Sequence, residues 1–115
     1  MILDAAFKVH TALGPGLLES VYETCLIHEL KSCGLKVENQ ISLPVAYGGI
    51  NVDSGLRLDL LIETCVIVEI KAVESIISLY NAQLLTYLKL SKTRIGLLIN
   101  FNTIHLRDGI KRLIN

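Results

Sequence analysis

The sequence predicts an α/β fold: two N-terminal helices, a mixed central sheet with an antiparallel hairpin, then a helix and further strands. Three observations predict it. Apolar residues recur at helical spacing over residues 1–33, with a break at Gly14-Pro15-Gly16. Two aliphatic runs, 57–62 and 66–73, are separated by a three-residue polar break, as in a hairpin. A helical pattern over 75–90 precedes a buried strand over 93–102, which such a crossover makes parallel to a neighbour.

Length and composition indicate one domain over residues 1–115. The chain is 51% hydrophobic and only 5% aromatic, which suits a compact aliphatic core. No apolar run reaches the roughly 18 residues of a membrane span and no leader is visible, so we expect a cytoplasmic protein without a membrane partner. Three cysteines without a CxxC motif are expected to be reduced core residues, and the scattered histidines predict no zinc site.

The first predicted helix covers residues 1–13 and the second about 17–33, ending at Gly34. Glu19 and Glu23 lie one turn apart near the start of the second helix, where the helix dipole favours acids; this explains Glu23 better than Glu19. The expected buried stripe of the second helix is Leu18, Val21, Tyr22, Cys25, Leu26 and Leu30.

A strand is predicted over 36–47, at an edge or bulged at Pro44, with a Gly48-Gly49 turn into a short strand over 50–53. Ser75 is the expected N-cap of the third helix, whose apolar spacing is carried by Ile76, Leu79, Leu84 and Leu88. Residues 104–114 fit an edge strand or a short helix.

Charged residues interrupt the two aliphatic runs of the hairpin. Asp59 lies in the first run, and Glu69 and Lys71 lie in the second. A three-residue loop makes the numbers of facing residues sum to 128, so Asp59 faces Glu69 and Arg57 faces Lys71, with all four on one side. Facing carboxylates repel unless a cation lies between them, and Mg²⁺ binds through one or two carboxylates. A two-residue loop would instead place Asp59 opposite Ile70.

A structural alternative explains the same charges. Lys71 would neutralise one acid and Arg57 the other, in a charged ladder on a partly solvated face; such ion pairs are commoner than active sites. The charge distribution is uneven: residues 1–74 hold five basic and ten acidic residues, and residues 75–115 hold six basic and one acidic. A basic face opposite an acidic pocket suits a phosphate backbone, and ordinary solvated lysines explain it equally well.

Several motifs resemble known families. Asp59, nine further residues and then Glu69-Ile70-Lys71 resemble the signature of the PD-(D/E)XK nuclease superfamily, and LGPGLLESVYE, with Gly16, Glu19 and Tyr22, resembles the signature of the GxxExxY protein family. That second resemblance continues through LPVAY, RLDLL, VEIKAVE, AQLLTYL, GLLINFN and DGIKRL, in this order along nearly the whole chain. It implies a restriction-endonuclease-like core; the activity of the GxxExxY family itself is not established.

The resemblance also implies a chemistry, namely metal-dependent hydrolysis of phosphodiester bonds in DNA or RNA. Asp59, Glu69 and the backbone carbonyl of Ile70 would bind Mg²⁺ or Mn²⁺, with Glu19 as a further candidate ligand. Lys71 would orient the attacking water or stabilise negative charge. Gln83 and Tyr87, one turn apart on the third helix, would support the site, as would Arg57 and Tyr22; a polar patch between helix and sheet edge explains Gln83 and Tyr87 equally well.

Two departures from the superfamily pattern favour alternatives. Leu58 replaces the proline that gives the signature its first letter, and the basic footprint is slight for an enzyme that holds nucleic acid alone. The second point suggests a homodimer, a higher oligomer or a partner that adds contacts. The rival function is a non-catalytic nuclease-fold module for nucleic-acid or protein binding and oligomerisation. A third is hydrolysis of a small phosphoester. The intact set of Asp59, Glu69 and Lys71 favours catalysis, because a binding module has no need for buried like charges.

Overall fold

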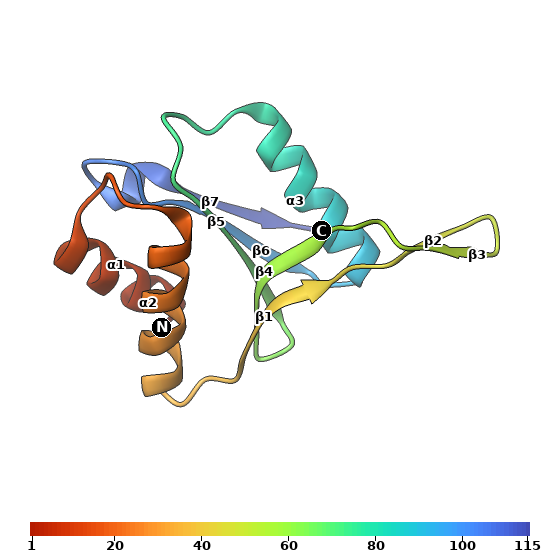
Figure 1. Cartoon of the computed structure of the whole chain (residues 1–115), viewed down its shortest axis with the longest axis horizontal. Helices are drawn as coiled ribbons and strands as arrows, with labels where there is room; N and C mark the ends of the chain where they lie inside the picture. The colour runs from red at the N-terminus through yellow and green to blue at the C-terminus, as the bar shows by residue number, and fades with distance from the viewer.

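The computed structural model describes all residues, 1–115, as a five-stranded mixed sheet with helices on both faces (Figure 1). Helices α1 and α2 cover one face and α3 covers the other. In chain order the elements are α1 (Ile2–Leu13), α2 (Glu19–Ser32), β1 (Val37–Ser42), β2 (Val45–Tyr47), β3 (Ile50–Val52), β4 (Arg57–Ile62), β5 (Val66–Lys71), α3 (Ser78–Ser91), β6 (Ile95–Asn100), the 3₁₀ helix η1 (Leu106–Gly109) and β7 (Ile110–Ile114).

The strand order is β1-β4-β5-β6-β7. Strand β4 pairs antiparallel with β1 and β5, and β7 pairs antiparallel with β6. Strand β6 is parallel to β5, because α3 forms the crossover between them. The predicted fold, with its two N-terminal helices and its mixed sheet, is therefore confirmed. None of the helices has the length and apolar composition that a membrane span requires.

Two hydrophobic cores lie on the two faces of the sheet. On the face of α1 and α2, Tyr22 stacks on Phe101 with ring centroids 4.7 Å apart, and both side chains are fully buried. On the face of α3, Leu84 and Leu88 pack against Ile67 of the sheet. The cysteines are free thiols, and Cys25 packs against the core under α1 and α2. Cys33 and Cys65 are exposed, so the expectation that all three lie in the core is wrong.

The start and end of α2 are fixed by local hydrogen bonds. The Tyr22 hydroxyl donates to the carbonyl of Gly14 (2.6 Å) and accepts from the N–H of Leu17 (3.1 Å), which holds the loop before the helix. At the other end Gly34, with φ of +83°, adopts the left-handed conformation that a side chain would disfavour. The predicted end of this helix at Gly34 is correct.

Two expectations for the helix starts are wrong. Leu18 (73% exposed) and Val21 (38% exposed) lie outside the buried stripe, because the helix begins at Glu19 and Leu18 is its extended N-cap. Ser75 is not the N-cap of α3, which begins at Ser78 after Ile77. The intervening loop is instead held to β6, since the side chain of Asn100 bonds both the N–H and the carbonyl of Val73 (3.1 and 2.9 Å).

The β2–β3 hairpin projects from the end of the sheet along the longest dimension of the molecule (Figure 1). Gly48 and Gly49, both with positive φ, connect the paired residues Tyr47 and Ile50, as the predicted two-residue turn requires. The single strand predicted over 36–47 is wrong, because the chain leaves the main sheet after Ser42, just before Pro44. Residues 104–114 combine both expectations, a short 3₁₀ helix and the edge strand β7.

Candidate active site

The β4–β5 hairpin pairs in the predicted register and then opens. The pairs Leu60–Val68, Leu61–Ile67 and Ile62–Val66 all sum to 128, as the three-residue loop requires. Beyond Leu60 the backbone ladder stops, and two carboxylate side chains lie between the strands. Arg57 and Lys71 therefore do not form the predicted facing pair.

Each carboxylate at the opening accepts a backbone hydrogen bond from the opposite strand. The N–H of Asp59 donates to Oε2 of Glu69 (2.9 Å), and the N–H of Ile70 donates to Oδ2 of Asp59 (2.8 Å). These side chains take the place that backbone carbonyls hold in a regular ladder, so the buried amide groups remain paired. The predicted proximity of Asp59 and Glu69 is present in the structure.

The faces of β4 are reversed at Asp59. Leu60 and Ile62 belong to the core under α1 and α2, whereas Leu58 belongs to the core under α3. A regular strand would place all three on one face, so the expected alternation that put Arg57 and Asp59 on one side does not apply. In β1 the reversal lies at Gln40, whose φ of +50° is left-handed.

A cavity of about 250 Å³ opens beside Asp59. Its lining comes from α2, β1, β4 and β5: Glu19, Ser20, Glu23, Gln40, Asp59 and Ile70. The Gln40 amide Nε2 donates to Oε1 of Glu23 (2.8 Å) and lies 3.5 Å from Oδ1 of Asp59. The cavity thus brings together Glu19, Asp59 and Ile70, three of the residues that the sequence singled out.

Three cavity residues, Ser20, Glu23 and Gln40, were not assigned to the site from the sequence. The spacing of four between Glu19 and Glu23 was a usable signal, because it places both acids on one helix face. Gln40 had no comparable signal. Its position opposite Asp59 depends on the β1–β4 register, and residues 43–56 separate those strands without fixing it.

Burial and like charge raise the pKa values of the acids. The pKa of Glu69 is raised to about 8, first by burial and then by the charge of Asp59. The hydrogen bond from the Asp59 N–H and the charge of Lys71 act in the opposite direction. Burial raises the pKa of Asp59, while the Ile70 N–H, Lys71 and Gln40 act in the opposite direction. The pKa of Glu19 is also raised, by burial first; Lys71 opposes this shift, and Asp59 and Glu23 add to it.

Lys71 influences all three acids without forming an ion pair with any of them. The ion pairs of the molecule lie elsewhere, at Met1–Asp4, Lys8–Glu29 and Lys36–Glu38. The Lys71 ammonium instead lies 4.6 Å from the ring centroid of Tyr80. The charged ladder, in which Lys71 and Arg57 neutralise the two acids, is therefore absent from the structure.

The other residues that the sequence assigned to the site differ in whether they lie beside the acids. Tyr87 of α3 is buried, and its pKa is raised by burial and then by the charges of Glu69 and Asp59, while Gln83 lowers it. Tyr87 and Gln83 therefore flank the site from α3. Tyr22 lies in the core, where it positions the start of α2 and hence Glu19. Arg57 is exposed at the first position of β4.

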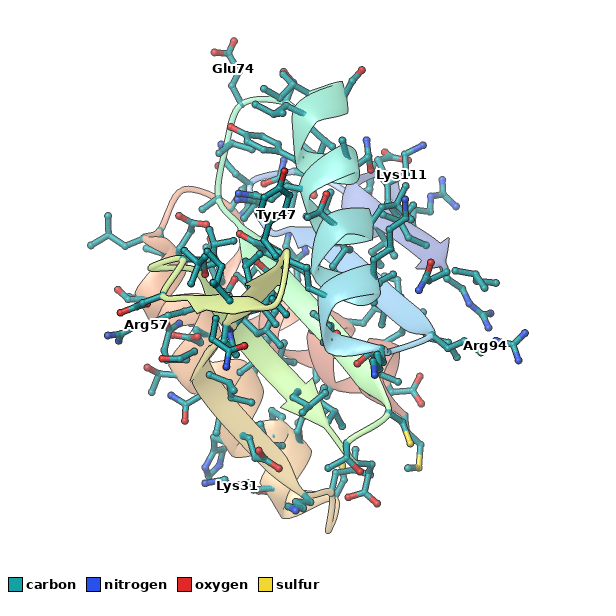
Figure 2. The ribbon with its side chains drawn as sticks, turned by 90° about the vertical axis from the view of Figure 1, so that its right-hand side faces the viewer. Lys31, Tyr47, Arg57, Glu74, Arg94 and Lys111 are labelled. Carbon is teal, nitrogen blue, oxygen red and sulfur yellow. The ribbon has the colours of Figure 1, made fainter.

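Most of the C-terminal basic residues lie away from the carboxylates. Arg94 directly precedes β6, at the end where Ile95 pairs with Val66, whereas Lys71 pairs with Asn100 at the other end. Figure 2 shows Arg94 and Lys111 on one side of the molecule and Arg57 on the other. Arg94 is thus separated from the acids by the length of the strands, whereas Lys111 pairs with Leu98, which pairs with Glu69, so Lys111 lies level with the acids and two strands away.

The residues at the opening fit a hard divalent cation. Carboxylate and carbonyl oxygens suit Mg²⁺ or Mn²⁺, and no cysteine or histidine is present to favour zinc. Neither Asp59 nor Glu69 forms an ion pair with a cationic side chain, and a divalent cation would supply positive charge between them. No group of three or more acidic, histidine or cysteine side chains converges closely enough to hold a metal ion by itself.

Comparison with known proteins agrees with this fold. No curated protein and no solved structure matches the chain significantly. The family model of the PD-(D/E)XK nuclease superfamily, in contrast, matches residues 1–113, nearly the whole chain. With its mixed sheet, its flanking helices and its two acids at the open hairpin, the chain belongs to the PD-(D/E)XK nuclease superfamily.

Proposed function

We propose that residues 1–115 form a single domain that hydrolyses phosphodiester bonds of nucleic acid with Mg²⁺ or Mn²⁺, and that the chain is a GxxExxY-type member of its superfamily. The observation that carries the proposal is the contact between Asp59 and Glu69 at the open end of β4 and β5. A buried acid, Glu69, beside a partly buried one, Asp59, is costly without a cationic partner unless the two bind an ion. Lys71, two residues beyond Glu69, is free of ion pairs and available for chemistry.

The proposal gives each residue a role. Asp59, Glu69 and the carbonyl of Ile70 hold the cation, and Glu19 adds a ligand directly or through water. A bound divalent cation supplies charge stabilisation and a lowered water pKa. The Lys71 ammonium orients the attacking water or stabilises the negative charge that develops on the phosphate. Gln83 and Tyr87 hold this arrangement from α3.

The β2–β3 hairpin favours a second candidate function, a non-catalytic module for protein binding or oligomerisation. Cross-strand partners share a face, so Val45, Tyr47, Ile50 and Val52 form one apolar face of this ribbon. Tyr47 and Ile50 are exposed, and a two-stranded ribbon is marginally stable alone. A second subunit covering this face would also supply the contacts that the slight basic footprint lacks.

Cleavage of labelled single- and double-stranded DNA and RNA, with Mg²⁺ or Mn²⁺, tests the proposal. Glu69→Gln and Lys71→Met are compared with Glu38→Gln and Lys36→Met, which remove an acid and a base from an exposed ion pair near the far end of β1. We expect cleavage to be lost in the first two variants and retained in the controls, with folding checked by circular dichroism.

Cleavage that survives in all four variants would place the activity elsewhere. No cleavage of any substrate, together with no cation binding in calorimetry, would favour the binding module. Sedimentation of the native protein and of Tyr47→Ser would then show whether the apolar hairpin face holds subunits together.

A further inference from the structure

We propose that Tyr80 is a positioning residue that holds the Lys71 ammonium apart from Asp59 and Glu69, so that both carboxylates stay available to a cation. The Lys71 Nζ lies 4.6 Å from the centroid of the Tyr80 ring, over its face. The contact itself is a property of this chain; its value for cation binding rests on the proposed function.

The position of Lys71 requires an explanation. Its charge acts on Glu19, Asp59 and Glu69, yet it forms no ion pair with any of them. A flexible lysine beside partly buried carboxylates is drawn toward them by a charge attraction that burial strengthens. Something must oppose that attraction, and the negative face of an aromatic ring attracts an ammonium group in this way.

Both sides of the contact are held in place by the backbone. The carbonyl of Lys71 accepts from the N–H of Phe101 (2.9 Å), which fixes the end of β5 against β6. Tyr80 lies in the first turn of α3, where its N–H donates to the carbonyl of Ile77 (3.0 Å). The loop between them is tied to Asn100 through Val73. Tyr80 and Lys71 are therefore placed by two separate elements whose relative position is fixed.

The consequence concerns competition for the carboxylates. Without the ring, the ammonium is free to pair with Glu69 or Asp59, and a divalent cation must then displace it. The ring face matters and the hydroxyl does not, so Tyr80→Phe keeps the contact while Tyr80→Leu removes it. Leu79→Ala is the control, because Leu79 directly precedes Tyr80 in the first turn of α3 and is 68% exposed.

Two measurements test the proposal. Protons above an aromatic face resonate upfield, so the Lys71 Cε methylene signals are expected upfield in native protein and Tyr80→Phe, and at ordinary positions in Tyr80→Leu. Calorimetry with Mg²⁺ or Mn²⁺ is expected to give about fivefold weaker binding for Tyr80→Leu, and binding within about twofold of native for Tyr80→Phe and Leu79→Ala.

The outcomes separate this proposal from the nuclease function. Lys71 signals that are unshifted in native protein, or cation affinity equal in Tyr80→Leu and native protein, would overturn it. If neither the native protein nor any variant shows measurable cation binding, the metal proposal fails. The role of Tyr80 is then supported if Tyr80→Leu alone shows hydrogen bonds from the Lys71 ammonium to a carboxylate by NMR, and overturned if it does not.

Discussion

The backbone N–H of Asp59 donates a 2.9 Å hydrogen bond to the side chain of Glu69, and Asp59 in turn accepts from the N–H of Ile70. The candidate metal ligands thus also complete the hydrogen bonding of the sheet where β4 and β5 separate. The protonation state of these acids is therefore coupled both to the stability of the fold and to the binding of any cation.

The stability of the cation-free protein is expected to fall as pH rises from about 4.5 to 8. The folded state keeps a proton on Glu69 up to its pKa of about 8, whereas the unfolded chain releases that proton near 4.5. The stabilisation is complete below the unfolded value and is lost through the folded one. Thermal unfolding with EDTA should show a decrease of about 5 °C or more over this range.

A substitution at Glu69 tests whether this acid, and no other, causes the pH dependence of stability. Glu69→Gln should flatten most of the decrease, and the matched variant Glu38→Gln should retain it. A native protein whose melting temperature is constant over this pH range would contradict the raised pKa.

Cation binding at pH 7 should release about one proton. With a pKa near 8, Glu69 is mostly protonated at that pH and must ionise to become a ligand. Calorimetry in buffers of different ionisation enthalpy measures this number. Near pH 9 the release should approach zero, and a value independent of pH would exclude Glu69 as the group that ionises.

Gln40→Gly should be more stable than Gln40→Ala by about 1 kcal/mol. The left-handed backbone at Gln40, with φ of +50°, is costly for any residue with a Cβ and easy for glycine. Urea unfolding measures the difference. Its neighbour Asn39 lies in ordinary strand conformation, so Asn39→Gly and Asn39→Ala should show the reverse order.

Tyr22→Phe should cost about 1–3 kcal/mol of stability. The substitution keeps the stack on Phe101 but removes the hydroxyl that bonds Gly14 and Leu17 in the loop before α2. Chemical denaturation provides the measurement, with the exposed Tyr47→Phe as a control that should stay within about 0.5 kcal/mol of native. An equal effect of both variants would mean that the loop does not depend on this hydroxyl.

Gly109→Ala should be far more destabilising than Gly96→Ala. A Cβ at Gly109 would overlap the backbone oxygen of Asn100, which cannot move aside, and we expect a cost of about 3 kcal/mol or more. At Gly96 the nearest atoms belong to the side chain of Leu84, 3.1 Å away, which has freedom to shift. Neither glycine has positive φ, so comparing their melting temperatures isolates the steric effect.

The parts of the structure that follow from local rules could be predicted from the sequence. The three-residue loop set the β4–β5 register, Gly34 ended α2, and the adjacent glycines formed the hairpin turn. The proximity of Asp59 and Glu69 followed from that register. The crossover through α3 made β6 parallel to β5.

The features that were missed depend on contacts between distant segments. The exposure of Leu18 and Val21 follows from where α2 starts, which the hydroxyl of Tyr22 and the loop before it determine. The loop before α3 is held by bonds between Val73 of that loop and Asn100 of β6, two residues that lie far apart in the sequence. The face reversal at Asp59 is accompanied by a left-handed backbone at Gln40 in the paired strand. The periodicity of apolar residues does not predict a single left-handed residue.

The β2–β3 hairpin joins β1 and β4 at a point that is already closed. The N–H of Leu43 donates to the carbonyl of Leu56 (3.0 Å), so the two chains leave the sheet as neighbours. Residues 44–55 lie beyond that bond, and their number does not affect the register that places Gln40 opposite Asp59. A change in the length or surface chemistry of this segment would therefore leave the pair of acids in place.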